Sequence, residues 1–176
     1  MASFESIVAH GQTSTDEALV LFDSLPPASQ TFMHGKWHGE GFNTDHPMDG
    51  LLETFGWHGK EFIDDNSVHP LVCRNNRGEL FNVDPQRIPM SLATGASLPR
   101  STFMSRIFLG LKPLLQTNKP RARLRMMEYR GKVSATMVYD HLPIHDVFRK
   151  VDENTVLGIM DLRGLDNPFF FVLRRE

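Results

Sequence analysis

Residues 122–139 read ARLRMMEYRGKVSATMVY. Two arms, Ala122–Tyr129 and Val133–Tyr139, flank Arg130-Gly131-Lys132, and a short connection containing glycine is typical of a β-hairpin. The second arm alternates apolar and polar residues, which is the period of a half-buried strand, with one face formed by Val133, Ala135, Met137 and Tyr139. The stretch therefore predicts an antiparallel pair of strands that turns one face toward a core.

Similar short strand patterns continue on both sides of this hairpin. Strands are predicted before it at 32–42, 57–63, 69–74 and 79–83, and after it at 147–151, 155–162 and 168–173. Turn-rich pieces such as Asn75–Gly78 and Asp152–Asn154 separate neighbouring strands. Closely spaced short strands with few helices between them indicate an antiparallel sandwich or barrel. We predict a mainly β fold with peripheral helices, an antiparallel barrel of about eight to ten strands.

Three helical patterns interrupt the strands. Cap-type residues and early acids open an amphipathic helix at 14–22, which we expect to cover one end of the barrel, after a mobile segment that includes His10. A short helix is predicted at 47–53, and an apolar helix at 103–116 that Pro113 ends or kinks. The whole chain, 1–176, is predicted to be one barrel domain, with a first segment at about 1–90, a helical insertion at about 91–118 and an antiparallel meander at about 119–176.

Composition excludes several classes of protein. A hydrophobic content of 40% and a charged content of 23% over 176 residues are those of a globular chain. The single cysteine, Cys73, excludes an internal disulfide framework, and its apolar surroundings predict a buried structural thiol. No stretch approaches the ~20 apolar residues of a membrane span, and the N-terminus lacks the basic start and apolar centre of a signal peptide. The expected location is cytoplasmic.

Charge is divided unevenly along the chain. The net charge is -2, but nine basic residues and only one acid, Glu128, lie between Arg100 and Lys132. This segment suits an anionic ligand, an acidic membrane surface or nucleic acid. Arg123 and Arg125 share one strand face and would clamp an anionic head group. A simpler interpretation is that the basic residues pair with the acidic first half or form a solvated outer face, and nucleic acid is not favoured.

Several motifs carry a family resemblance. Gly35-Lys36-Trp37-His38-Gly39 matches the G-x-W-x-G signature of the GXWXG domain family. The domain of unknown function that usually follows it is similar to this chain at Arg125–Gly131, Tyr139-Asp140, Phe148–Asp152 and Val156–Asp161. Together the two resemblances cover nearly the whole chain. The family's biochemical role is largely unassigned, so membership implies no activity.

Two weaker resemblances concern small barrels. A glycine and a tryptophan at the start of the first strand resemble the opening of lipocalins, which implies that Trp37 plugs one barrel end. Nitrobindin-like barrels begin similarly and bind haem through a late histidine, a role that His141 or His145 would take here. The long insertion and the absent disulfide depart from the lipocalin pattern.

The main functional hypothesis is a binding module that holds a fatty acid, lipid or similar small hydrophobic metabolite inside the barrel. Plain core packing would use the same apolar residues. The wall of the binding chamber is predicted to contain Trp37, Trp57, Phe62, His69, Tyr129, Met137, Tyr139, Phe148, Met160 and Phe171.

Two alternatives remain open. One is a cofactor-free isomerase or cyclase that uses His69, Asp140 and Lys60 for acid–base chemistry, although the chain has no assembled catalytic motif. The other is an interaction domain that docks another protein. No cofactor is expected, and no metal site is predicted, because the chain has no His-x-x-x-His spacing and no cysteine pair. His34, His38 and His58 occupy strand positions that alternate with Trp37 and Trp57. If the tryptophans face the core, these three histidines are predicted to face solvent.

Overall fold

The computed structural model describes residues 3–88 and 112–176. The strands are β1 (Gly35–Gly41), β2 (Trp57–Asp64), β3 (Ser67–Arg74), β4 (Leu80–Asn82), β5 (Ala122–Tyr129), β6 (Lys132–Tyr139), β7 (Ile144–Asp152), β8 (Thr155–Leu162) and β9 (Phe169–Arg175). The helices are α1 (Phe4–His10), α2 (Thr15–Ser24), α3 (Gln30–Met33), α4 (Leu51–Thr54) and α7 (Lys112–Leu115), with a 3₁₀ turn at Pro85–Arg87.

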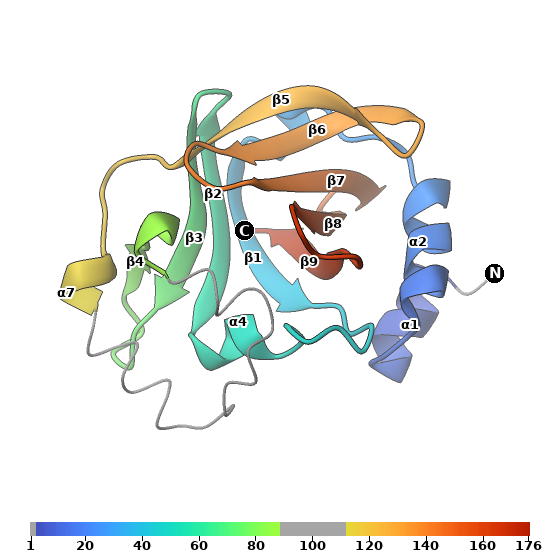
Figure 1. Cartoon of the computed structure of the whole chain (residues 1–176), viewed down its shortest axis with the longest axis horizontal. Coiled ribbons are helices and arrows are strands. Elements are labelled where there is room, and N and C mark those ends of the chain that lie inside the picture. Colours follow the sequence, from blue (N-terminus) through green and yellow to red (C-terminus); the bar gives the residue numbers. More distant parts are fainter. Residues whose placement is uncertain (1–2, 89–111) are drawn as a thin grey trace.

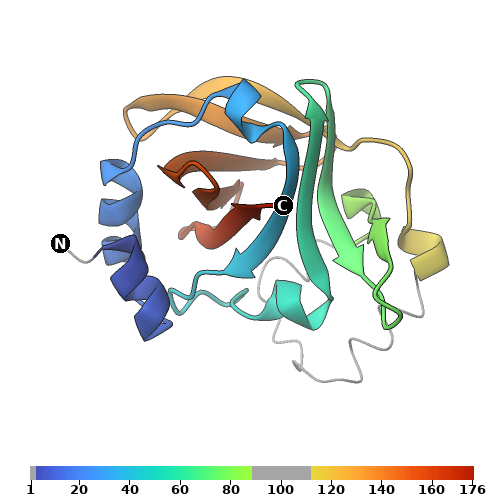
Figure 2. The same cartoon turned by 180° about the vertical axis from the view of Figure 1, so that it is seen from behind.

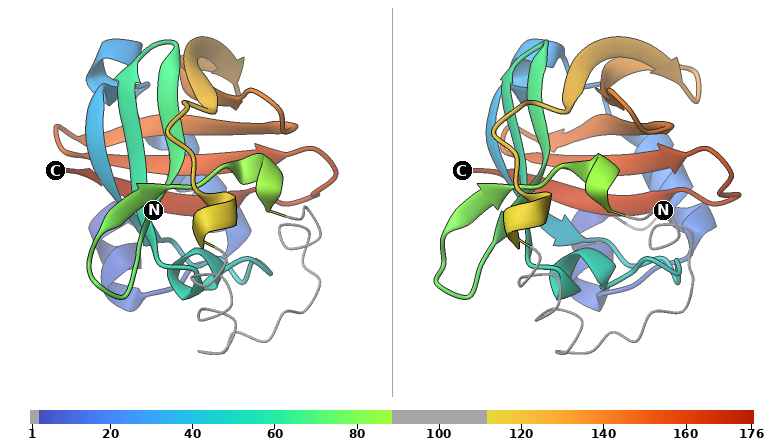
Figure 3. Two further views of the ribbon diagram at one scale, coloured as in Figure 1. Left: turned by 90° about the vertical axis from the view of Figure 1, so that its left-hand side faces the viewer. Right: turned by 60° about the vertical axis from the view of Figure 1, so that its left-hand side comes forward.

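All nine strands belong to one antiparallel sheet in the order β2-β1-β9-β8-β7-β6-β5-β3-β4. Because β2 also pairs with β3, every strand except β4 takes part in a closed ring, and β4 is attached to the outside of β3 (Figure 1). Strands β1–β3 cross β7–β9 at a steep angle (Figure 3). The predicted mainly β, barrel-like fold is confirmed, and strands from both halves of the chain build the same ring.

The β5–β6 hairpin confirms the predicted antiparallel pair of strands, but its turn is one residue shorter than the predicted connection Arg130-Gly131-Lys132. Ala122 pairs with Tyr139 at one end and Tyr129 with Lys132 at the other. Arg130 and Gly131 both have positive φ, 51° and 77°. Positive φ at both central residues defines a two-residue type I′ turn, whose twist matches that of the flanking strands.

The barrel has an inner core and an outer one. Alternate residues of the ring strands fill the interior, where Trp37, Phe62, Met137 and Phe148 are among the fully buried side chains. On the outside, α1 and α2 cover β7–β9 (Figures 1 and 2). Strand β8 is consequently buried on both faces, which explains its almost continuous apolar sequence.

The N-terminal helices differ from the prediction in two respects. Helix α2 begins at the expected cap residue Ser14, which forms a capping box with Glu17. The helix packs on the flank of the barrel rather than over one end. The segment expected to be mobile forms α1, because Ser3 caps its start and the buried side chains of Phe4 and Ile7 anchor it. His10 is the last residue of this helix.

A third, smaller cluster lies where β3, β4 and α7 meet and contains the predicted buried thiol of Cys73. Most of the predicted insertion at 91–118, including residues 103–111 of the apolar helix, lies outside the described residues. The described remainder includes α7, a single turn that contains Pro113. Within 3–88 and 112–176, no helix has the length and apolar character needed to cross a membrane.

Candidate functional site

An ion pair is buried inside the barrel. Lys60 alternates inward with Phe62 on β2, and Asp146 points inward between Ile144 and Phe148 on β7. The Lys60 Nζ atom lies 2.8 Å from Asp146 Oδ2, and the two side chains are only 4% and 2% exposed. Lys60 also donates a hydrogen bond to the carbonyl oxygen of Pro70 at 3.1 Å. Charges are rarely buried in an apolar interior, because removing them from water is costly even when they are paired.

Aromatic rings surround the ammonium group. Lys60 Nζ lies 5.1 Å from the ring centroid of Phe171, 5.6 Å from that of Trp57 and 6.0 Å from that of Tyr139. These distances allow cation–π attraction, which strengthens where water is excluded. The rings and the carboxylate together hold the Lys60 ammonium in place.

Burial changes the acid–base properties of this centre. It raises the pKa of the Asp146 carboxyl, and the neighbouring Lys60 charge opposes that rise. Burial also raises the pKa of Tyr139 well above its usual range, assisted by the Asp146 charge. Tyr139 therefore keeps its proton at neutral pH.

Two polar atoms around this centre have no hydrogen-bond partner among the described residues. They are Asp146 Oδ1, a hydrogen-bond acceptor, and Trp57 Nε1, a donor. Buried polar groups in folded proteins nearly always have partners, so each such exception needs an explanation.

Most of the predicted ligand-binding residues lie together in the interior core. These are Trp37, Trp57, Phe62, Met137, Tyr139, Phe148, Met160 and Phe171. Trp37 is held by a hydrogen bond from its Nε1 to the Met33 carbonyl oxygen at 2.7 Å, and the guanidinium of Arg175 lies over its ring.

The predicted place of Tyr129 in the interior wall is wrong. It lies outside the ring with the α1–α2 core, where its ring meets that of Phe22 edge-on. Residues 123, 125, 127 and 129 all alternate outward on β5, so Tyr129 does not face the chamber.

The three predicted catalytic residues are not brought together. Asp140 lies on the surface, 2.8 Å from Arg123. His69 stands opposite Glu61 in the β2–β3 ladder, so it shares that residue's face rather than the inward face of Phe62. Its ring is nevertheless buried, its Nδ1 has no partner in the described part of the chain, and burial lowers its pKa.

Lys60 alone is at the interior centre, and its partner is Asp146, which the sequence did not single out. A usable signal existed, because Asp146 is an acid at the inward position between two apolar residues of one strand. Predicting the pair also required knowing that β2 and β7 face each other across the barrel.

The predicted head-group clamp is also corrected. Arg123 and Arg125 lie on the outer face, and Arg125 donates to the carbonyl oxygen of Asp65 and the side chain of Asn66, each at 2.9 Å. The described ion pairs Arg121–Asp84 and Arg130–Asp23 follow the simpler interpretation, in which second-half bases pair with first-half acids.

The geometry does not favour a haem ligand at His141 or His145. His141 is exposed in the turn before β7. His145 alternates outward with Val147, which belongs to the outer core. Neither imidazole points into the barrel.

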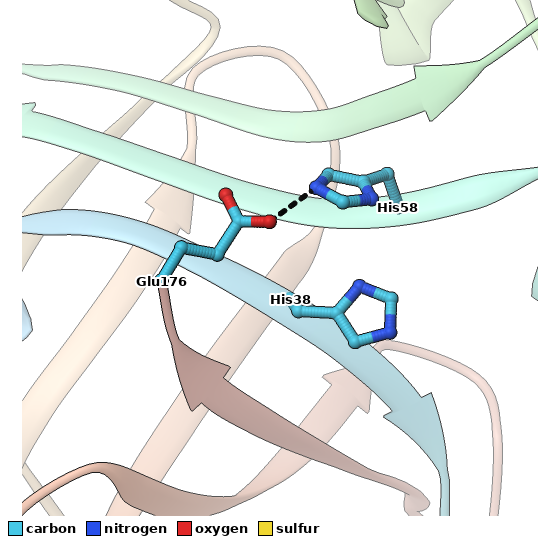
Figure 4. Close-up of side chains that lie close together, drawn as sticks. All are labelled: His38, His58 and Glu176. Carbon is cyan, nitrogen blue, oxygen red and sulfur yellow. Dashed lines mark hydrogen bonds and ion pairs between the residues drawn. The ribbon is translucent and has the colours of Figure 1, made fainter. Parts of the chain in front are cut away.

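A second polar cluster lies on the outer face of the barrel, where β1, β2 and the end of β9 are neighbours. His58 Nε2 lies 2.7 Å from Glu176 Oε1, and the ring centroids of His38 and His58 are 4.9 Å apart (Figure 4). Arg74 donates from Nη2 to His58 Nδ1 at 3.1 Å. His58 faces outward as predicted, but Glu176 and Arg74 cover it and leave it 7% exposed. His34 is separate and pairs with Asp65.

Sequence reasoning missed this cluster because its members are widely separated along the chain. A pocket of about 230 Å³ adjoins it, and its lining includes His58, Glu176, Lys36, Glu61 and Asn82.

Comparisons with known proteins agree with this architecture. Residues 20–78 match a family model described as GXWXG protein, and residues 120–175 match one described as domain of unknown function DUF4334. A crystal structure of a protein from Thermomonospora curvata has a TM-score of 0.72 and 31% sequence identity, covering 98% of this chain and 95% of that chain. No curated protein matches. None of these descriptions mentions lipocalins, lipids or haem, so those resemblances stay predictions.

Proposed function

The chain belongs to the GXWXG protein family, with the DUF4334 domain as its second part, and on that premise we propose that its barrel interior binds one small, largely hydrophobic ligand carrying a hydroxyl group. Neither family description states an activity, so the proposal rests on the interior of the barrel. A ring of about eight strands is wide enough either to be filled by its own side chains or to hold one small ligand.

The observation that carries the proposal is the pair of unpartnered polar atoms around Lys60. Leaving a buried donor or acceptor without a partner costs about 1–3 kcal/mol. Asp146 Oδ1 needs a donor and Trp57 Nε1 needs an acceptor. A hydroxyl group is both, so one such group on a ligand would serve either atom or both.

The same chemistry sets the class of ligand. Lys60 is already neutralised by Asp146 at 2.8 Å. A fatty-acid carboxylate would bring a second negative charge next to Asp146, which is unfavourable in a water-poor interior. A neutral alcohol, such as a fatty or terpenoid alcohol, avoids that repulsion.

The interior wall can adapt to an occupant. Met137 and Met160 lie among the aromatic rings of the inner core. Methionine side chains are unbranched and flexible, so they can move aside at low energetic cost. Binding is therefore expected to rearrange the methionines rather than the strands.

Fluorescence titration with a dansyl-labelled long-chain alcohol tests the proposal, with the matching carboxylic acid as the comparison ligand. The alcohol is expected to bind with 1:1 stoichiometry and more tightly than the acid. Asp146→Asn should weaken alcohol binding about tenfold, the equivalent of one hydrogen bond of about 1.4 kcal/mol, because its one remaining oxygen stays with Lys60 and an amide N–H₂ replaces the acceptor Oδ1. Trp57→Phe, which removes the Nε1 donor together with the five-membered ring of the indole, should act in the same direction.

Arg123→Gln is the matched control, because Arg123 lies on the outer face and contacts Asp140. The affinity of the Arg123→Gln variant for the alcohol and for the acid should equal that of the wild type. Equal binding of the alcohol by the wild type and both interior variants would contradict the proposal, and so would a clear preference for the acid.

A second function is favoured by one specific observation. Lys60, Asp146 and Tyr139 form a buried, connected set of proton donors and acceptors, and the pKa of Asp146 is raised. This arrangement suits a cofactor-free isomerase that moves a proton on a bound hydrophobic metabolite. In that case Tyr139→Phe would abolish turnover while the alcohol probe still bound with nearly unchanged affinity. Turnover that persisted in Tyr139→Phe would remove Tyr139 from the reaction.

A further inference from the structure

We propose that His38, His58 and Glu176 form a binding site for a divalent transition-metal ion of the zinc type on the outer face of the barrel. One ligand atom from each residue can be chosen so that all three lie within 4.8 Å of one another. Figure 4 shows the three side chains converging from separate strands. The three residues lie on the outer face, and the pocket beside them is also lined by Trp37 and Lys60, whose side chains belong to the interior.

The strands fix the positions of the three residues. His38 on β1 pairs with Gly59, the residue after His58 on β2. The backbone N–H of Glu176 donates to the carbonyl oxygen of Lys36 at 3.1 Å and so extends β9 along β1. Because the three strands are neighbours in one closed sheet, little backbone movement is needed to bring the donors around one ion.

The donor set matches zinc chemistry. Two imidazoles and one carboxylate are a common set of three protein ligands for Zn²⁺, which takes a water or substrate in the fourth position. Imidazole nitrogen also suits Ni²⁺ and Cu²⁺, whereas Mg²⁺ and Ca²⁺ prefer all-oxygen sites. His58 and Glu176 line the pocket of about 230 Å³ that also contains Asn82, Gln116 and Asn118. The open coordination position would face this pocket.

Without metal, hydrogen bonds hold the side chains of His58 and Glu176 in place. Arginine can only donate, so the contact from Arg74 requires His58 Nδ1 to be unprotonated. The proton of neutral His58 is then on Nε2, which donates it to Glu176. When the metal binds Nε2, this proton moves to Nδ1, and Arg74 must withdraw.

Arg74 is therefore a competitor of the metal. Its side chain is exposed and also donates to the Gly78 carbonyl oxygen at 3.1 Å, so it has an alternative partner when it withdraws. Replacing Arg74 with glutamine removes the positive charge and supplies an amide oxygen that can accept the Nδ1 proton. Such an outer acceptor is the usual support of a metal-bound histidine.

Isothermal titration with ZnCl₂ after chelator treatment and dialysis tests the site, with Co²⁺ visible absorption as the report on coordination. One Zn²⁺ per chain is expected, together with the intense bands of four-coordinate Co²⁺. Loss of an outer-shell partner costs about 10- to 100-fold in metal affinity, so His38→Gln, which removes a direct ligand, should weaken Zn²⁺ binding at least that much. Glu176→Gln should do the same, and Arg74→Gln should strengthen binding about tenfold.

His34→Gln is the matched control, because His34 pairs with Asp65 and takes no part in the cluster. It should bind Zn²⁺ as the wild type does. His38 is not among the buried core residues, so its variant is expected to fold, which circular dichroism will verify. The proposal is overturned if the wild type shows no saturable Zn²⁺ binding, if His38→Gln binds normally, or if His34→Gln loses as much affinity as His38→Gln.

Discussion

The Lys60 ammonium and the Asp146 carboxylate meet 2.8 Å apart inside the barrel, although 86 positions separate them in the chain. The first belongs to the GXWXG segment and the second to the DUF4334 segment. The contact therefore joins the two matched families across one interior.

Removing either partner of this pair should destabilise the protein strongly. Lys60→Met or Asp146→Leu leaves the opposite charge buried alone, and such losses cost about 3–5 kcal/mol. The double variant removes both charges and should return the free energy of unfolding close to the wild-type value or above it. Urea denaturation of the four proteins gives the coupling energy.

Arg123→Ala is the control for an exposed ion pair, because Arg123 and Asp140 meet at the surface. It should change stability by less than about 1 kcal/mol. If Lys60→Met and Asp146→Leu each lower the free energy of unfolding only slightly, water reaches the Lys60–Asp146 pair.

The second glycine of the GXWXG motif should be intolerant of any side chain. A Cβ atom on Gly39 would lie 2.2–2.6 Å from three carbon atoms of the buried Trp57 ring. Overpacking of this kind costs about 1–3 kcal/mol. Gly39→Ala should therefore lower the urea midpoint and shift the tryptophan emission, because Trp57 must move.

Gly41→Ala in the same strand is the comparison. Its Cβ would come too close only to the carboxylate end of the exposed Glu53 side chain, and its contact with Asn43 Oδ1 at 3.7 Å is an ordinary one. If the two variants lose equal stability, the steric explanation of the motif is wrong.

Acidification should weaken the fold through two buried imidazoles. Burial is the main cause that lowers the pKa of His46 and His69 below the ordinary value of 6.5. The unfolded chain therefore binds more protons than the folded one as the pH falls below 6.5. The stability from these neutral groups is complete above that pH and is lost as the pH falls toward their folded pKa values, with a slope of at most about 1.4 kcal/mol per pH unit for each group.

His46→Asn and His69→Gln should each flatten this slope in urea titrations between pH 7 and pH 5. In the wild type the backbone N–H of Met48 donates a hydrogen bond to His46 Nδ1 at 3.1 Å. The asparagine side chain offers an oxygen that can accept the same hydrogen bond. His10→Gln, at the exposed end of α1, should leave the slope unchanged. An unaltered slope in both buried variants would assign the acid sensitivity to other groups.

Cys73 should be chemically inert while the protein is folded. Burial raises the pKa of its thiol to about 12, and only the thiolate reacts readily with alkylating reagents. Iodoacetamide labelling followed by mass spectrometry should show negligible modification at pH 8 in buffer and complete modification in urea. Rapid labelling of the folded chain would show that the β3–β4–α7 cluster opens.

The sequence by itself predicted the strands, helix α2 and the family, but it did not predict helix α1. Alternation of side chains and turn-rich connections located all nine strands and three of the hairpins between them, because these patterns depend on neighbouring residues only. It also identified most of the interior wall, since Met137 and Tyr139 share the parity of one buried face. The G-x-W-x-G motif identified the family without revealing that Gly39 is small to make room for Trp57.

Only the tertiary structure decided which charged residues meet. Closing β2 onto β3 and bringing β9 beside β1 places Lys60 opposite Asp146 and His38 beside His58 and Glu176. It also turns Arg123 and Tyr129 away from the interior. Such contacts depend on which strands become neighbours in the ring and on bulges that shift strand parity, as between β2 and β3. Neither is encoded in the spacing of nearby residues, so the candidate sites emerge only when the ring closes.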